Sequence, residues 1–361
     1  MNMAQQNISI EGIASDYSRY ALPQYNVIQH GLPKAIEQLF KPLQISSDTG
    51  SVRMVDLGTA DGVNSFPIIE GFAKTLIAKH TETRPKLYVT HVDVPTSDFK
   101  SLTANIYNHP NSYLHHLGEA LDVQPNIEPN SFYAAYGEPH SADVVFATTC
   151  LHYASTSVSQ VEGHVDPLYA KGEQKQAWSD LSRADLDLVM NQVHRSLHTG
   201  GKFWTIAPAH ICDERTGNIK NHWNREVWDI MIEQLTAMEQ SGTVDSQQWQ
   251  EFVIPVHQRK LDEWTQWFSL NADKFKLEYA EVAELPNPYL ELFLKDHQDL
   301  NRFADDYLGF FKSWAERILA SLVPEETHRT ALYINMHKAF ESDPQRFADD
   351  NVSVYVAATA V

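Results

Sequence analysis

The chain has 361 residues, of which 43% are hydrophobic and 11% aromatic, which excludes a protein that is disordered over most of its length. A formal net charge of −19 at pH 7 excludes nucleic acid and anionic membrane surfaces as partners, because the protein's own field repels dense phosphate. The two cysteines, Cys150 and Cys212, are too few for a disulfide framework, and no apolar run is long enough to span a membrane. Because the N-terminus also lacks the order of a signal peptide, we expect a cytoplasmic protein.

Helix and strand signals alternate over residues 1–214, which we predict to form one α/β core. A helix is expected at QYNVIQHGLPKAIEQLF, and strand candidates separated by helix-length segments follow it. These candidates are residues 52–57, 86–92, 142–149 and 202–207. Because strands that alternate with helices pair in parallel, the order predicts a doubly wound, Rossmann-like sheet.

From residue 215 to 345 the pattern becomes mainly helical and rich in aromatic residues, which predicts a helical cap. The strand-like run FKLEYAEV, residues 275–282, interrupts these helices, and residues 346–361 end in NVSVYVAATAV. We expect 275–282 to return to the core sheet and 346–361 to supply its final strand, so that the two runs form an outer pair.

The stretch DLGTADGVNS, residues 56–65, joins the first predicted strand to a helix. Gly58 and Gly62 permit a tight turn, but their G-x-x-x-G spacing is not the G-x-G-x-x-G that cradles a pyrophosphate. A ligand without phosphates fits better, and Asp56 would suit the ammonium of S-adenosylmethionine. Asp93, at the end of the next strand, would then hold ribose hydroxyls. The alternative is an ordinary strand-to-helix turn with a solvated aspartate.

Several motifs, in this order along the chain, resemble those of the SABATH family of S-adenosylmethionine-dependent carboxyl methyltransferases. The N-terminal motif is YSRYALPQ, in which Ala21 stands where the family has serine. In the segment ATTCLHYAS, Tyr153 replaces the family's tryptophan, and His257 stands where the family usually has tyrosine. The other matching segments are DLGTADGVN, DVPTSDF, SFY, GGKFW, VWDIM and FVIPVH.

The resemblance implies a class I methyltransferase whose residues 1–214 form the cofactor-binding core with an N-terminal lid segment, while residues 215–345 form the substrate pocket. Gln24 and Tyr153 would hold the acceptor's carboxylate as the catalytic pair, and a homodimer is expected. The implied cofactor-binding residues are Tyr17, Asp56, Gly58, Asn64, Asp93, Ser131 and Phe132. The other implied pocket residues are His152, Trp228 and His257, for the last two of which a place in the core is the alternative.

Methyl transfer to a carboxylate is an in-line displacement by an oxygen that is already ionised near neutral pH, so we predict a mechanism without a general base. None of the 17 histidines lies in an H-E-x-x-H or similar spacing, and no metal is predicted. The predicted acceptor is a small-molecule carboxylic acid, whose identity the sequence leaves open. Methyl transfer to nitrogen or hydroxyl, or cofactor binding without turnover, are the alternatives.

Overall fold

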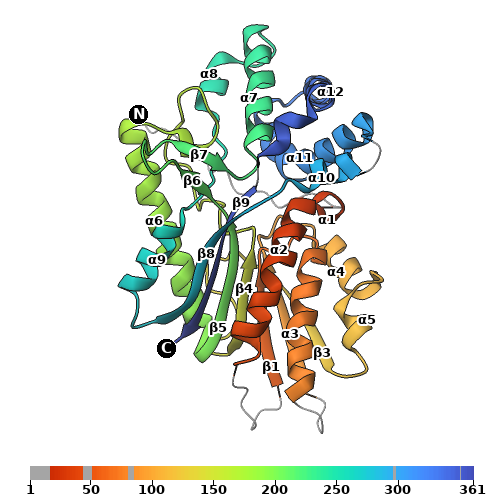
Figure 1. Cartoon of the computed structure of the whole chain (residues 1–361), viewed down its shortest axis with the longest axis vertical. Coiled ribbons are helices and arrows are strands. Elements are labelled where there is room, and N and C mark those ends of the chain that lie inside the picture. Colours follow the sequence, from red (N-terminus) through yellow and green to blue (C-terminus); the bar gives the residue numbers. More distant parts are fainter. Residues whose placement is uncertain (1–16, 44–50, 80–84, 296–297, 350) are drawn as a thin grey trace.

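The structure, a computed structural model, describes residues 17–43, 51–79, 85–295, 298–349 and 351–361 (Figure 1). Its central element is a seven-stranded sheet in the order β3-β2-β1-β4-β5-β9-β8. Strands β3 to β5 pair in parallel, whereas β9 pairs antiparallel with both β5 and β8. The strands are β1 (Ser51–Leu57), β2 (Lys86–Asp93), β3 (Asp122–Pro129), β4 (Ala142–Thr148), β5 (Leu197–Pro208), β8 (Phe275–Leu285) and β9 (Asn351–Ala360).

Helices cover both faces of this sheet, which confirms the predicted doubly wound α/β fold (Figure 1). Alternate residues of β1 point to opposite faces, so that Val52 and Met54 pack in one hydrophobic core and Val55 and Leu57 in the other. The first face carries α2 (Leu22–Ala35), α3 (Phe66–Lys79), α4 (Phe99–Asn108) and α5 (Tyr113–Leu117), and the second carries α6 (Gly172–Ser196) and α9 (Leu261–Leu270).

Strand β3 is the one member of this sheet that the sequence analysis did not predict. Its sequence DVQPNIEP has no apolar run, and its residues are half-buried or exposed. The strand lies at the edge of the sheet, where Pro125 is tolerated because one side of the strand forms no ladder. Edge position therefore explains why its hydrophobic signal is weak.

A helical cap stands above the carboxyl ends of the parallel strands (Figure 1). Its helices share a separate aromatic-rich core, and α1 (Tyr17–Tyr20) lies against α11, where Gly309 leaves room for the ring of Tyr20. The cap helices are α7 (Arg225–Gln240), α8 (Ser246–Glu251), α10 (Pro288–Lys295), α11 (Leu300–Leu322) and α12 (Glu326–Ser342). The remaining elements are β6 (His210–Cys212), β7 (Ile219–His222), the π-helical segment η1 (Ile36–Phe40), and the short 3-10 helices η2 (Val63–Ser65), η3 (Pro167–Tyr169) and η4 (Pro344–Ala348).

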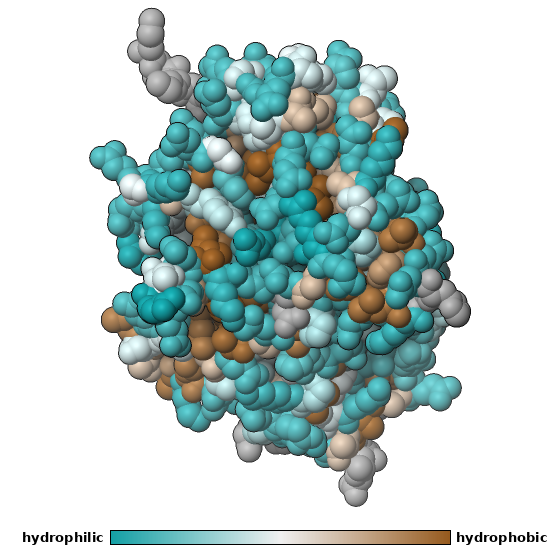
Figure 2. Space-filling view, turned by 45° about the horizontal axis from the view of Figure 1, so that its top comes forward, coloured by the Kyte–Doolittle hydropathy of each residue, from teal (hydrophilic) through white to brown (hydrophobic). Residues whose placement is uncertain are grey.

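The surface visible in Figure 2 is dominated by hydrophilic residues, and apolar residues appear in separate patches rather than in one continuous band. The apolar side chains of the cap therefore serve mainly its internal core. No helix in the described parts of the chain combines the length and the apolar composition that crossing a bilayer requires.

Candidate functional site

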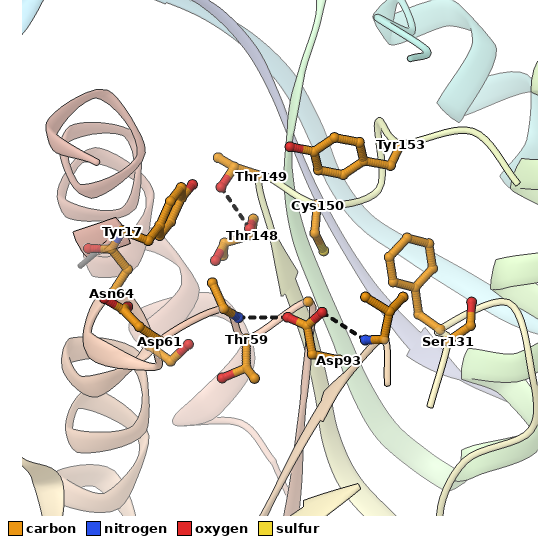
Figure 3. A pocket seen from close by; sticks show the side chains of 15 residues that line it. Tyr17, Thr59, Asp61, Asn64, Asp93, Ser131, Thr148, Thr149, Cys150 and Tyr153 are labelled. Carbon is orange, nitrogen blue, oxygen red and sulfur yellow. Dashed lines mark hydrogen bonds between the residues drawn. The ribbon is translucent and has the colours of Figure 1, made fainter. Parts of the chain in front are cut away.

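A cavity of about 750 Å³ opens at the carboxyl ends of β1, β2 and β4, the usual ligand position in open α/β sheets (Figure 3). Each strand delivers part of its wall through the loop that follows it, and α1, which precedes β1 in the chain, adds Tyr17. We call this space the first cavity. It is lined by Tyr17, Gly58, Thr59, Ala60, Asp61, Asn64, Ser65, Asp93, Val94, Ser131, Phe132, Thr148, Thr149, Cys150 and Tyr153.

The glycine turn forms one wall of the first cavity, and its first glycine is required by geometry. Gly58 has a φ of +67°, and a Cβ atom there would lie 2.4 Å from the Cβ of Cys150 on the neighbouring strand end. Its N–H donates to the carbonyl of Val92 at 2.8 Å. Glycine therefore allows the ends of β1, β2 and β4 to approach one another closely.

Asp93 points into the same cavity, held by three donors (Figure 3). Its Oδ2 accepts from the N–H of Ala60 at 2.7 Å, and its Oδ1 accepts from Val94 N–H at 2.8 Å and Ser97 Oγ at 2.6 Å. Burial raises the pKa of Asp93 above its ordinary value, although these hydrogen bonds oppose the shift. The carboxylate thus fastens the glycine turn while it faces the cavity.

Asp56 does not line the cavity, contrary to the prediction that it binds the cofactor. Its carboxylate is buried beneath the turn, where Oδ2 accepts from Thr59 Oγ1 at 2.7 Å and lies 2.9 Å from His91 Nδ1. The other nitrogen of His91 lies 3.0 Å from the hydroxyl of Tyr113. Asp56 therefore anchors the turn through Oδ2, which contacts both Thr59 and His91.

We expect Asp56→Ala to destabilise the fold, since the change leaves His91 and Thr59 buried without their acceptor. A buried polar group that loses its partner costs about 1–3 kcal/mol of unfolding free energy. Urea unfolding measures the loss, with Asp180→Ala as the matched control, because the Asp180 side chain is 56% exposed and its removal should change stability little. Equal stability of the two variants would show that the buried network does not support the fold.

Asp61 is a cavity residue that the sequence analysis missed, although its place inside the glycine turn was a usable signal. It is buried, and its Oδ2 accepts from the N–H of Ser18 at 2.9 Å, while its Oδ1 accepts from the hydroxyl of the same residue. Because Ser18 belongs to α1, this carboxylate ties the N-terminal helix to the turn. Nearby, Asn64 Nδ2 is buried without a hydrogen-bond partner and faces the cavity.

A second cavity, of about 550 Å³, lies between the sheet and the cap. It shares three residues with the first cavity, Tyr17, Thr149 and Tyr153, so that the two spaces meet at a common wall. No lysine or arginine occurs among the described residues that line it. Its other lining residues are Gln24, His152, Pro208, Trp223, Asn224, Trp228, Ile254, Val256, Gln258, Phe310 and Trp314.

Of the residues predicted for the acceptor pocket, Gln24, His152, Tyr153 and Trp228 line this second cavity, whereas His257 does not. The ring atom Nε2 of His257 lies 2.8 Å from Asp185 Oδ2. The backbone N–H of His257 donates to the backbone carbonyl of His152 at 2.5 Å. The backbone of His257 therefore supports the segment that carries His152 and Tyr153, while its ring points to the buried carboxylate of Asp185 instead of the cavity.

Burial keeps the two predicted pocket histidines neutral. Desolvation lowers the pKa of His152 to about 3 and, against the opposing effect of Asp185, the pKa of His257 to about 4. Burial also raises the pKa of the Tyr153 phenol far above its ordinary value, so that its hydroxyl stays protonated. The second cavity thus presents uncharged donors and aromatic rings near pH 7.

Metal ligands are not assembled in this part of the molecule. Over residues 17–43, 51–79, 85–295, 298–349 and 351–361, no group of three or more His, Cys, Asp and Glu side chains is placed to hold an ion.

A family model and a solved structure each match nearly the whole chain. A family model described as SAM dependent carboxyl methyltransferase matches residues 11–357, which include every residue of both cavities. Jasmonate O-methyltransferase of Arabidopsis thaliana is 28% identical over 153 residues, a match that spans only 39% of this chain and 39% of that relative. The fold is similar to that of a loganic acid methyltransferase solved with SAH, with a TM-score of 0.77, 16% identity and 98% of each chain covered.

Proposed function

The chain belongs to the family of S-adenosylmethionine-dependent carboxyl methyltransferases, and we propose that it forms the methyl ester of a small-molecule carboxylic acid. In this proposal the cofactor occupies the first cavity and the acid occupies the second. The observation that carries it is the common wall of Tyr17, Thr149 and Tyr153, since in-line transfer requires donor and acceptor to meet directly.

The polar groups of the first cavity fit S-adenosylmethionine, which supplies the methyl group from a sulfonium centre. Asp93 offers a carboxylate for the ribose hydroxyls, and the unpartnered Asn64 Nδ2 offers a donor for the methionine carboxylate. Asp61, which lines the cavity where Asp56 does not, is the acidic residue proposed for the ammonium group. Its Oδ2 keeps a lone pair beyond the bond to the N–H of Ser18, whereas its Oδ1 accepts from both Ser18 Oγ and the N–H of Val63. Ser131 and Phe132, the residues predicted for the adenine, also line the cavity. Ser131 lies on the far side of Asp93 from Tyr17 (Figure 3).

The second cavity suits a carboxylate that is recognised by neutral donors. The Gln24 amide and the Tyr153 hydroxyl can each donate to one carboxylate oxygen, and the surrounding aromatic side chains exclude water. A charged partner is not needed, since the carboxylate keeps its reactivity better beside neutral donors than in an ion pair. The chain's own contribution to catalysis is then positioning and desolvation.

A base-free mechanism predicts a chemical step that is nearly independent of pH from 6 to 8. The acid, with a pKa near 4, is fully ionised over this range, and His152, with its pKa lowered to about 3, does not change protonation there. Single-turnover rates with saturating cofactor measure the step. The pH range stops at 6 because the folded protein loses stability in more acidic solution. His152 and His257 have lower pKa values in the folded protein than in the unfolded chain, so the unfolded chain binds more protons and the free energy of unfolding falls as the pH drops below about 6.5.

An acid limb near pH 6.5 that disappears in His152→Gln would contradict this mechanism and favour a hydroxyl or nitrogen acceptor.

The function itself is tested with isotopically labelled S-adenosylmethionine and a panel of aromatic, aliphatic and terpenoid acids, with mass spectrometry of the products. Labelled methyl esters are expected, and a label on nitrogen or on a hydroxyl would replace the proposal. The homodimer and the cytoplasmic location stay predictions, for light scattering and cell fractionation to test.

A further inference from the structure

One residue of the second cavity, Asn224, has a conformation that neither the fold nor the proposed carboxylate clamp explains. It precedes α7 with φ +54° and ψ +36°, the left-handed region that is uncommon for residues with a side chain. At this N-cap position an asparagine normally accepts a hydrogen bond from the first turn, but the Asn224 side chain makes no capping bond. Its Oδ1 is instead buried without a partner and lines the cavity.

A donor without a partner also lines the second cavity. Trp314 Nε1, from α11, is buried and makes no hydrogen bond. Its ring lies tilted against that of Trp228, with the centroids 5.4 Å apart, and Trp228 belongs to α7, the helix that Asn224 precedes. None of these three residues lines the first cavity, so they form a wall away from the methyl donor.

A buried polar atom without a partner costs free energy, so a lone acceptor and a lone donor that line the same cavity point to a ligand group there. Gln24 Oε1 and His152 Nδ1 are also unpartnered, but they belong to the residues proposed for the carboxylate end. A ketone could satisfy only Trp314, and an ammonium only Asn224. A hydroxyl group is the smallest that donates to one and accepts from the other.

We infer that the acceptor is a hydroxylated hydrophobic carboxylic acid, whose hydroxyl donates to Asn224 Oδ1 and accepts from Trp314 Nε1. The inference rests on the proposed function for the carboxylate end. The apolar side chains of Ile254, Val256 and Phe310 form the wall around the body of the acid. Asn224 and Trp314 are then specificity-determining residues.

The experiment compares matched acids that differ by one hydroxyl: 3-phenylpropanoic acid and its ortho-, meta- and para-hydroxylated forms. At least one hydroxylated acid should exceed the parent acid in kcat/KM by about tenfold, the contribution of one well-made hydrogen bond. The ratio of kcat/KM for the hydroxylated acid to that for the parent acid should fall towards one in two variants. Trp314→Phe removes the N–H donor and keeps an aromatic ring, and Asn224→Gly removes the acceptor and suits the left-handed backbone. Trp249→Phe, a cap tryptophan outside the cavity, is the matched control and should keep the ratio.

Two readouts separate this inference from the proposed function. Calorimetric binding of the same acids, with S-adenosylhomocysteine present, reports the hydroxyl preference without turnover. A preference in binding with no methyl ester formed would overturn the carboxyl methylation but keep the hydroxyl site. Methyl esters formed at equal kcat/KM from all four acids, or an equal loss for parent and hydroxylated acids in Trp314→Phe, would overturn the hydroxyl site and keep the proposed function.

Discussion

We expect Asp93→Ala to bind S-adenosylmethionine roughly ten- to a hundredfold more weakly than the unmodified protein, because hydrogen bonds to a charged group contribute about 1.5–3 kcal/mol. The substitution removes the acceptor proposed for the ribose hydroxyls. It also releases Ala60 N–H and Ser97 Oγ, which the carboxylate holds at 2.7 and 2.6 Å. Isothermal titration with the cofactor measures the loss directly.

Ser97→Ala is the matched control for this experiment. It removes one of the three donors that hold Asp93 but leaves the carboxylate in the cavity, so the loss of affinity should be much smaller. A similar loss in both variants would mean that the turn, rather than the carboxylate, governs binding. Unchanged affinity in folded Asp93→Ala would remove Asp93 from the cofactor site.

The second large effect is expected at the carboxylate clamp. Gln24→Ala and Tyr153→Phe should each lower kcat/KM for the acid by roughly ten- to a hundredfold, since each removes a neutral donor to a charged oxygen. Cofactor affinity should change little in Gln24→Ala, because Gln24 lines only the second cavity. Tyr153→Phe keeps the ring that lines both cavities and removes only the hydroxyl.

Gln29→Ala provides the control on the same helix, because Gln29 is exposed and lines neither cavity. Steady-state kinetics with the preferred acid and calorimetry with the cofactor give the two affinities separately. Should Gln24→Ala lose cofactor binding and keep its activity on the acid at saturating cofactor, the clamp assignment is wrong.

Which residues line the first cavity was largely predictable, because their positions depend on local sequence. A glycine turn after one strand and an acid after the next must meet, since parallel strands end at the same edge of a sheet. Gly58, Asn64 and Asp93 accordingly line one cavity. Asp61 rather than Asp56 lines the cavity, because the sequence does not show which side chain of the turn faces inwards, and His91, 35 residues later in the chain, contacts Asp56 Oδ2.

The acceptor side was less predictable because it depends on packing between distant segments. His257 looked like a pocket residue, but its ring pairs with Asp185, which is 72 residues away. Asn224 gave no signal, since its importance lies in a left-handed backbone and an unused capping oxygen. Such features appear only once the cap is placed on the core.

The position of β9 sets the order in which this protein can assemble during synthesis. Thr359 of β9 pairs with Lys202 of β5, more than 150 residues earlier in the chain. The part of the sheet formed by β5, β9 and β8 therefore cannot pair until β9 has been synthesised and has left the ribosome. Until then β5 and β8 expose open edges, which makes the incomplete chain prone to aggregation. Asn351 of β9 also accepts the N–H of Asn224 at 3.2 Å. The glycine turn of the first cavity can therefore form early, whereas the wall of the second cavity that carries Asn224 is completed last.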